Sequence, residues 1–449
     1  MQAEASRRMP RPTLTSRTRP TPLIDPIEAF AQASDVDQRS LWLRPSSGDA
    51  LVGIGAAQTL TGSGAARFDM VSSQWRALLA EADIDPRDGV GPRLFGGFSF
   101  DPSAGSTPTW NGFGDARLVL PERTITIRAG AAWLTTNGVH GQQQVGAEPR
   151  TRSAEPSLSP AEWQSLVRDV AEAIRANVSG LRKVVLARAE HGRPTRSIED
   201  ALRWLAAEYP TCSVFAIANR EACFLGATPE HLISLRRGIA TTTALAGTAP
   251  RGQTPADDER IAQQLAHDPK ERTEHALVVD ALRDGLTEVS SRVVADAQPR
   301  VHKLPNVQHL LTPIRAQLRP GRTVLDLVER LHPSPAVGGM PREAALEVIR
   351  EREALDRGWY AAPMGWVDQN GEGDFVVGLR SALVRGDRAT LFSGCGIVGG
   401  SHPAKEWAEW EWKLRPMRAA LGIEGRSTGG IDARSTLSID ATPALGIDA

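Results

Sequence analysis

The periodicity of the apolar residues changes repeatedly along this chain of 449 residues, and this change constrains the fold more than any other feature. Between residues 26 and 140, apolar and β-branched residues gather in short runs that glycine and proline separate, which is typical of strands. Between residues 159 and 422, such runs alternate with stretches whose apolar residues recur every three or four positions, which is typical of helices. The sequence therefore predicts a mixed α/β fold with largely antiparallel sheets and outer helices.

Individual segments carry these patterns clearly. Strands are expected over residues 51–57, 93–100, 123–127, 183–189 and 212–218, and several more within 222–245. Helices are expected over residues 198–208, 256–266, 270–289 and 404–421. In the second of these strands, Gly96 and Gly97 present no side chain, which indicates that another element passes close to the backbone there.

A further helix is expected to begin at Pro160, because its N-terminal signals are complete. Ser159 is a good N-cap, proline suits the first helical position, and Glu162 at the third position completes a capping box. The apolar residues that follow form one stripe: Trp163, Leu166, Val167, Val170 and Ile174. This stripe is expected to pack on the protein core.

Three stretches lack both patterns. Residues 1–25 are rich in Arg, Pro and Thr, residues 141–158 are polar with scattered proline, and the tail, residues 423–449, repeats Ile-Asp-Ala three times. We predict a disordered leader, a linker or loop, and a disordered tail. The linker divides a strand-rich N-terminal part, 26–140, from a larger C-terminal part, 159–422. A transit peptide is the alternative for the leader, and a short partner-binding segment is the alternative for the tail.

Charge and composition exclude several classes of partner. Lys and Arg number 52 and Asp and Glu 53, so nothing favours nucleic acid or an anionic membrane surface. No apolar run reaches the ~18 residues of a spanning helix, and no apolar core of a secretory signal follows the first arginines. Cys212, Cys223 and Cys395 lack metal-binding spacing. We therefore expect a reduced cytoplasmic protein without structural zinc.

Two residues suit acid and base chemistry. Strand alternation places Lys183 on one face with Val185 and Ala187, and burial of a lysine lowers its pKa so that it can act as a general base. Glu230 follows a strand and the turn-forming pair Thr228-Pro229, which fixes the glutamate at the edge of a sheet. The alternatives are a lysine that reaches water from a strand end and a glutamate in an ordinary surface turn.

Four carboxylates on two helices suit a hard cation such as Mg²⁺. Glu271 and Glu274 share one helix face, and Glu406, Glu409 and Lys413 share another, beside an apolar stripe that contains Trp407 and Trp410. A solvated face beside a core face is the alternative.

Anion recognition is indicated at two other points. Arg380 is expected inside an otherwise apolar strand, where an arginine usually has an anionic partner. The glycine-rich turn that begins at Ser393 exposes backbone N–H donors.

In order along the chain, these segments resemble the chorismate-binding enzymes, and the resemblance covers residues 159–421. The motifs that carry it are KVVLAR (183–188), FLGATPE (224–230), ALAGT (244–248), KERTEH (270–275), VQHL (307–310), HPSPAVGGMPR (332–342), GCGIV (394–398) and EWAEWEWKL (406–414). The family includes isochorismate and salicylate synthases and the large subunits of anthranilate and aminodeoxychorismate synthases. The resemblance implies their fold, chorismate as the small-molecule substrate, Mg²⁺ as the cofactor and a monomer.

The resemblance also implies roles for the matching residues. Lys183 would activate the attacking water, and Glu230 would protonate the departing C4 hydroxyl. Glu274 and Glu409 would bind Mg²⁺, with Glu271 and Glu406 as acidic companions. The substrate-binding positions would be Ala246, Gly247, Thr248, His309, Ala336, Tyr360, Arg380, Gly394, Cys395, Gly396 and Lys413. Cys395 departs from the family, where alanine is common between the two glycines.

Two positions separate the members of this family. Aminodeoxychorismate synthases carry a nucleophilic lysine where this chain has Ala246, and anthranilate and salicylate synthases carry a threonine where it has Ala336. The pattern resembles that of isochorismate synthases, which convert chorismate to isochorismate reversibly by attack of water at C2. A salicylate synthase and a catalytically silent chorismate-binding module are the alternatives.

Overall fold

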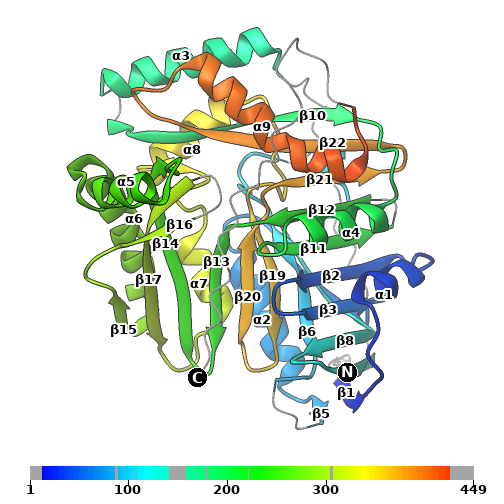
Figure 1. The fold of residues 1–449 in the computed structure, drawn as a ribbon. Coiled ribbons are helices and arrows are strands. Elements are labelled where there is room, and N and C mark those ends of the chain that lie inside the picture. The colour runs from blue at the N-terminus through cyan, green and yellow to red at the C-terminus, as the bar shows by residue number, and fades with distance from the viewer. Residues whose placement is uncertain are drawn as a thin grey trace, which may run out of the picture.

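A computed structural model describes residues 13–85, 89–105, 107–140, 158–177, 180–220, 222–303 and 307–424, and only the backbone of Thr248, Lys270, Glu274 and Val307 (Figure 1). The described helices are α1 (Pro26–Gln32), α2 (Arg67–Leu79), α3 (Pro160–Arg175), α4 (Ile198–Glu208), α5 (Pro255–His267), α6 (Pro269–Thr287), α7 (Val324–Leu331), α8 (Arg342–Arg352) and α9 (Pro403–Leu421). Among these residues no helix is long and apolar enough to cross a membrane.

The described strands form two large sheets. The order across the 12-stranded sheet is β18 (Gly339–Met340), β10 (Lys183–Gly192), β22 (Arg388–Ile397), β21 (Ser381–Arg385), β12 (Ala222–Thr228), β11 (Ser213–Asn219), β2 (Gln38–Arg44), β3 (Asp49–Ile54), β8 (Arg123–Arg128), β9 (Ala131–His140), β1 (Thr13–Pro20) and β5 (Asp83–Ile84). The order across the 10-stranded sheet is β15 (Ser290–Ala295), β17 (Val307–Leu318), β14 (Ile239–Pro250), β13 (His231–Arg236), β20 (Gly373–Val377), β19 (Pro363–Asp368), β6 (Arg93–Phe98), β7 (Ala116–Leu120) and β4 (Gln58–Gly62), and β16 (Arg300–Lys303) also pairs with β17. Neighbouring strands are antiparallel except β1 and β5. The predicted fold class is confirmed.

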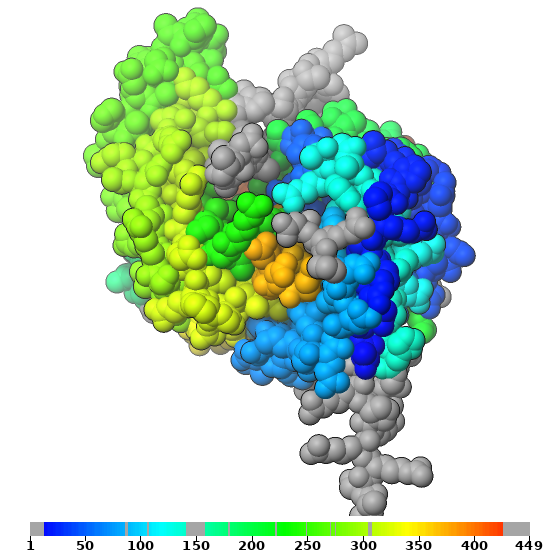
Figure 2. Space-filling view, turned by 90° about the horizontal axis from the view of Figure 1, so that it is seen from below, coloured from blue at the N-terminus to red at the C-terminus, as the bar shows by residue number. Residues whose placement is uncertain are grey.

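The N-terminal and C-terminal parts of the chain share both sheets. Strand β2 pairs with β11 in the larger sheet, and β6 pairs with β19 in the smaller one. Figure 2 shows the same arrangement from below, with blue-to-cyan residues on one side, green-to-yellow residues on the other and an orange segment between them. Residues 26–140 are therefore part of one fold with the C-terminal part, because β2 and β6 each pair with a strand of that part.

Two local predictions are confirmed. Ser159 accepts a hydrogen bond from the backbone N–H of Glu162, and the Glu162 carboxylate accepts one from the backbone N–H of Ser159, so the capping box of α3 is complete. In β6 a side chain at Gly96 would lie 1.9 Å from the backbone oxygen of Arg117 in β7. The glycine is therefore required by the close approach of the neighbouring strand.

The prediction of a disordered leader over residues 1–25 is wrong for the described part. Strand β1 pairs with β9 along its whole length, and Asp25 caps α1. Along β1, Leu14 is fully buried and Ser16 donates a hydrogen bond to the side chain of Asn137 at 2.8 Å. The inward face of this strand is mostly hydroxyl-bearing, and the sequence therefore lacks the apolar alternation by which strands are recognised. Residues 1–12, 141–157 and 425–449 lie outside the described residues.

A stack of aromatic rings connects the core to one tyrosine. Tyr360 stacks on Phe392 at 5.3 Å between centroids, Phe392 stacks on Trp110 at 5.4 Å, and Trp110 meets Phe224 edge to face at 5.2 Å. These side chains are buried. The tyrosine ring is consequently held by packing before any ligand binds.

Candidate active site

Lys183 is the first residue of β10 and lies against the glycine-rich strand β22. Val185 is directly opposite Gly396, and a side chain at Gly396 would lie 2.9 Å from Cε of Lys183. The glycine thus leaves the space that the lysine side chain occupies. The predicted shared face of Lys183 and Val185 is confirmed, since both lie on the side of Gly396. Lys183 itself is half-buried at the start of the strand.

Glu230 lies where the chain passes from one sheet to the other, between β12 and β13. The hydroxyl of Thr228 donates to the backbone oxygen of Val377 at 2.6 Å and accepts from the backbone N–H of Glu230 at 3.2 Å. The backbone oxygen of Glu230 in turn accepts from the N–H of Val377 at 3.0 Å. One threonine side chain therefore fixes the backbone that carries the glutamate.

Burial raises the pKa of the Glu230 carboxyl, and the positive charges of Lys183, His231 and Arg380 oppose that effect. A carboxyl group with a raised pKa keeps its proton at a pH where ordinary glutamates have lost it. Such a group is suited to donate a proton to a leaving hydroxyl.

Arg380 lies at the second crossing between the sheets. The apolar run around it is divided into β20 and β21, which belong to different sheets, so the interpretation of one continuous strand is wrong. Arg380 adopts φ 47° between them, a left-handed conformation that is uncommon outside glycine. Because β13 pairs with β20 and β12 pairs with β21, the two crossings that carry Glu230 and Arg380 are neighbours.

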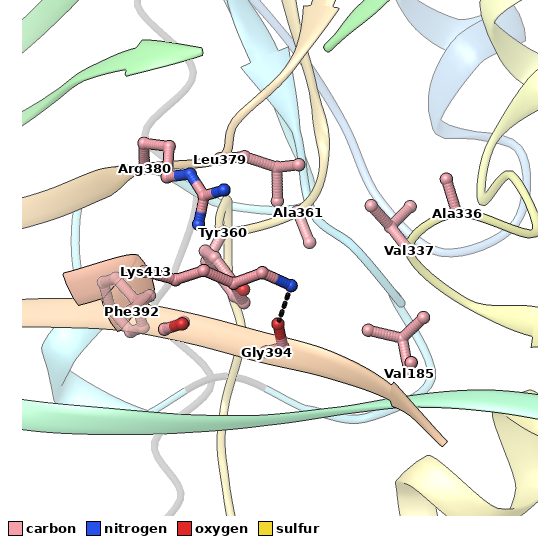
Figure 3. Close-up of a pocket in the computed structure, with 12 residues that line it drawn as sticks. Val185, Ala336, Val337, Tyr360, Ala361, Leu379, Arg380, Phe392, Gly394 and Lys413 are labelled. Atoms are coloured by element: carbon pink, nitrogen blue, oxygen red, sulfur yellow. Dashed lines mark hydrogen bonds between the residues drawn. The ribbon is translucent and has the colours of Figure 1, made fainter. Parts of the chain in front are cut away.

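A cavity of about 480 Å³, including its open mouth, lies beside these crossings. It is lined by Val185, Ala336, Val337, Tyr360, Ala361, Leu379, Arg380, Phe392, Ser393, Gly394, Gly396 and Lys413. In Figure 3 the polar groups Arg380, Tyr360 and Lys413 lie on one side, and Val185, Ala336 and Val337 lie on the other. The ammonium of Lys413 donates to the backbone oxygen of Gly394 at 3.1 Å. A cavity with two cations on one wall and an apolar opposite wall suits an anionic organic molecule.

Two of the predicted metal ligands lie together on α9. Ligand atoms of Glu406, Glu409 and Cys395 lie within 4.8 Å of one another, and Lys413 Nζ lies 2.6 Å from the Glu409 carboxylate. Burial and the neighbouring Glu409 raise the pKa of Glu406. Mg²⁺ binds carboxylate oxygens and relieves the repulsion between neighbouring carboxylates, so Glu406 and Glu409 fit this ion. The side chain of Glu274 lies outside the described part of the structure.

Cys395 faces away from the cavity. Its side chain is fully buried against α9 and its thiol lies 3.3 Å from the backbone oxygen of Glu406, while Gly394 and Gly396 face the cavity. Alternation along β22 turns the Cys395 side chain to the opposite face. The predicted role of this position in substrate binding concerns its backbone N–H and stays a prediction. Burial raises the pKa of this thiol to about 12, which keeps it protonated.

The remaining predicted residues form a second group, where α6 packs on β14 and β17. A bulge in β14 separates Ala246 from Thr248, and Gly247 adopts φ 77° within it. Nδ1 of His309 lies 3.3 Å from the backbone oxygen of Gly247, and a side chain at Gly247 would lie 3.4 Å from Cβ of Glu271. Ala246, Gly247, His309 and Glu271 are thus neighbours, but they do not line the described cavity.

A family model for chorismate binding enzymes matches residues 1–148 and 140–422 of this chain. The chain belongs to the chorismate-binding enzyme family.

Relatives and solved structures agree with this assignment. The chain is 39% identical over 443 residues to the salicylate biosynthesis isochorismate synthase of Pseudomonas aeruginosa, with 92% of this chain and 91% of that protein covered. It is 36% identical over 445 residues to an isochorismate synthase of Bacillus subtilis, with 92% and 94% covered. The fold is similar to that of the menaquinone-specific isochorismate synthase of Escherichia coli, with a TM-score of 0.73, 26% identity and coverage of 91% of this chain and 95% of that one.

Sequence reasoning about this chorismate-binding enzyme missed the apolar half of its cavity. Ala361, Leu379 and Phe392 line it, but in the sequence they belong to ordinary apolar runs. Val337 also lines it, and lies in the motif at 332–342, in which only Ala336 was singled out. Only Val185 could have been found, since alternation places it on the face of Lys183. Thr228 was noted as part of a turn, and its role in holding Glu230 follows from contacts with β20 that no local pattern reveals.

Proposed function

We propose that this chorismate-binding enzyme is an isochorismate synthase that converts chorismate to isochorismate reversibly, by attack of water at C2 and loss of the C4 hydroxyl. The observation that supports the proposal is a cavity lined by Arg380 and Lys413, with Lys183 against its lining residue Gly396. Glu230, whose pKa is raised by burial, interacts with Lys183 and Arg380, and neither it nor Lys183 lines the cavity itself. The relatives named above bear the names of isochorismate synthases. Their coverage of this chain supports transfer of the activity.

Base and acid act on opposite ends of the displacement. Lys183 takes a proton from the water that attacks C2, and Glu230 gives its proton to the departing C4 hydroxyl. Burial raises the pKa of Glu230, and the positive charges of Lys183 and Arg380 act against that rise. These charges therefore stabilise the carboxylate that remains after proton transfer. In the reverse reaction the two residues exchange roles, which matches a reversible reaction.

Arg380 and Lys413 hold the substrate. Chorismate carries two carboxylates, and these two cations line the polar wall of the cavity. Tyr360, stacked on Phe392, adds a hydroxyl on the same wall. Val185, Ala336 and Val337 offer a surface for the apolar side of the ring.

Mg²⁺ is the proposed cofactor, held by Glu274 and Glu409 with Glu271 and Glu406 as companions. The ion would neutralise the ring carboxylate and stabilise charge that develops in the ring. Without it, the acidic face of α9 would repel a dianion.

The metal requirement can be tested directly. We expect chorismate turnover by the purified protein to stop in excess chelator and to return when Mg²⁺ is added. Glu409→Ala should raise the Mg²⁺ concentration needed for half-maximal rate, whereas Glu411→Ala, a carboxylate on the same helix outside the described acidic group, serves as the control. Full activity in chelator would remove the ion from the proposal.

Product choice within the family is assigned to two alanines. Ala246, at the bulge of β14, has no amine where aminodeoxychorismate synthases carry a lysine. Ala336, on the cavity wall, has no hydroxyl where salicylate synthases carry a threonine. We therefore infer water as the nucleophile and isochorismate as the released product.

A further inference from the structure

A buried ion pair lies directly behind the apolar wall of the cavity. Nε of Arg357 donates to Oε1 of Glu353 and one terminal nitrogen donates to Oε2, both at 2.6 Å. The side chains are 3% and 0% exposed, respectively. Removing two charges from water costs several kcal/mol per ion, so a pair at this depth needs additional hydrogen bonds to offset that cost.

Those hydrogen bonds go to the two segments that form the cavity wall. The terminal nitrogens of Arg357 donate to the backbone oxygens of Val185, at 2.7 Å, and Val337, at 3.0 Å. Glu353 accepts a hydrogen bond at 2.7 Å from the backbone N–H of Ala187. One guanidinium thus connects β10 to the segment that carries Ala336 and Val337.

The ion pair takes the place of a strand at the edge of β10. Strand β18 pairs only with Lys183 and Val184, and the last bond from this side is from the N–H of Val185 to the oxygen of Gly338 at 2.9 Å. Beyond that point the next backbone groups of β10 are satisfied by Arg357 and Glu353. The first residues of β10, including the lysine, are therefore held on this edge by the pairing with β18, by the hydrogen bond to Gly338 and then by the ion pair.

A third contact leads to the polar wall. The backbone N–H of Tyr360 donates to the backbone oxygen of Arg357 at 2.7 Å, and the guanidinium of Arg357 lies over the ring of Phe100, 4.2 Å from its centroid. The arginine is thus fixed by packing and in turn fixes the backbone turn that carries Tyr360.

We propose that Arg357, held by Glu353, is a positioning residue for the reaction of Lys183. It sets the separation between β10, which carries the base, and the wall at Ala336 and Val337, which the substrate ring contacts. The inference rests on the proposed function. A displacement of about 1 Å at a reacting group lowers rates by roughly 100-fold, so loss of this connection should act on kcat. Arg380 and Lys413 are not part of the connection, so KM for chorismate should change little.

The experiment replaces both charges together. Glu353→Leu with Arg357→Met leaves no unpaired buried charge, and apolar replacements of buried ion pairs are often neutral or stabilising. We expect this double variant to melt near the wild-type temperature and to lose roughly 10-fold to 100-fold in kcat with little change in KM. Retention of stability together with loss of kcat is a combination that a merely structural pair would not give.

A matched control lies at the other end of the same strand. Arg418 on α9 pairs with Glu190 on β10, with nitrogen–oxygen distances of 2.7 Å and 2.5 Å, outside the cavity lining. Glu190→Leu with Arg418→Met should leave kcat and KM close to wild type. Comparable loss of kcat in both double variants would overturn the proposal, because any ion pair on β10 would then serve equally.

Other outcomes also decide. Wild-type kcat in the folded Glu353/Arg357 double variant, or a change confined to KM, overturns the proposal. If that variant does not fold, Arg357→Lys decides, since lysine keeps the charge but cannot reach both carbonyls and both carboxylate oxygens with a planar fork. A lower kcat at unchanged KM supports the proposal, and wild-type kcat overturns it. Absence of turnover in the wild type and in the control variant would instead remove the proposed function, and this inference with it.

Discussion

At the scale of single residues, two proposed site residues lie at points where the chain leaves one sheet and enters the other. They are Glu230, the proposed acid, and Arg380, a proposed binding group for the substrate carboxylates. Glu230 lies between β12 and β13, and Arg380 lies between β20 and β21. At such points backbone groups turn away from the ladder, and side chains can point into the space between the sheets. The hydroxyl of Thr228 and the backbone of Val377 then fix the glutamate at this position.

Loss of either proton-transfer group should abolish most of the activity. We expect Lys183→Ala and Glu230→Gln each to lower kcat by about 100-fold or more, because general acid or base catalysis contributes at least that factor. Both variants should keep a wild-type circular dichroism spectrum. Steady-state kinetics on chorismate with Mg²⁺ provides the measurement, and a near-wild-type rate in either variant would exclude that residue from the mechanism.

The raised pKa of Glu230 predicts that Glu230→Gln, which lowers activity, raises thermal stability at neutral pH. The folded protein binds this proton more tightly than the unfolded chain, so the stability it contributes is present below the ordinary glutamate pKa and lost as pH rises through the raised value. We therefore expect Glu230→Gln to melt at a higher temperature than wild type at neutral pH. The difference should shrink in mild acid. Thermal melts of both proteins across this range provide the test, and a pH-independent difference would contradict it.

Most site residues could be predicted from motifs, but their partners could not. The sequence indicated Lys183, Glu230 and Arg380, because each interrupts an expected pattern of apolar residues or turns. Glu353 and Arg357 have the i, i+4 spacing of countless exposed pairs, and nothing local distinguishes a buried one. The distinction comes from contacts with β10 and Val337, which lie far away in the sequence.

At the scale of elements, predictions succeeded where a segment's own residues decide its conformation. The capping box at Ser159 and the apolar stripe after it specify α3 without help from the rest of the chain. Strand β1 is the opposite case, because hydroxyl groups lie on its inward face. These hydroxyl groups can be buried only because side chains of β9 form hydrogen bonds with them. The break at Arg380 also depends on the second sheet, which a single apolar run does not reveal.

The pairing of β1 reverses the expectation for a truncated chain. The disordered leader implied that deletion of residues 1–22 would leave the melting temperature unchanged. Because β1 pairs with β9 along its length and buries Leu14, we now expect that deletion to lower it by several degrees. Loss of one buried leucine alone costs about 2 kcal/mol or more.

A shorter deletion distinguishes the effect of losing β1 from the effect of losing the residues before it. Removal of residues 1–12 leaves all of β1 in place, so calorimetry of the two truncated proteins compares chains with and without the strand. Equal melting temperatures for both would show that β1 contributes nothing to stability.

At the scale of the whole molecule, the predicted linker over residues 141–158 divides the sequence into two parts, and strands from both parts share each sheet. Pairing of β2 with β11 and of β6 with β19 joins segments far apart in the chain. Strand pairing over such distances leaves no periodic trace in either segment, so only the fold class could be predicted. The monomer stays a prediction that sedimentation in solution can check.

In the proposed function, the cavity with Lys183 and Glu230 near its lining directs water to chorismate and releases isochorismate. The most direct measurement is chromatography of products formed from chorismate and Mg²⁺ at neutral pH, with prompt quenching because isochorismate decays to salicylate without enzyme. We predict isochorismate as the main early product, little salicylate, and no anthranilate when ammonia is supplied. Stoichiometric salicylate and pyruvate at the earliest times, or anthranilate with ammonia, would contradict the account.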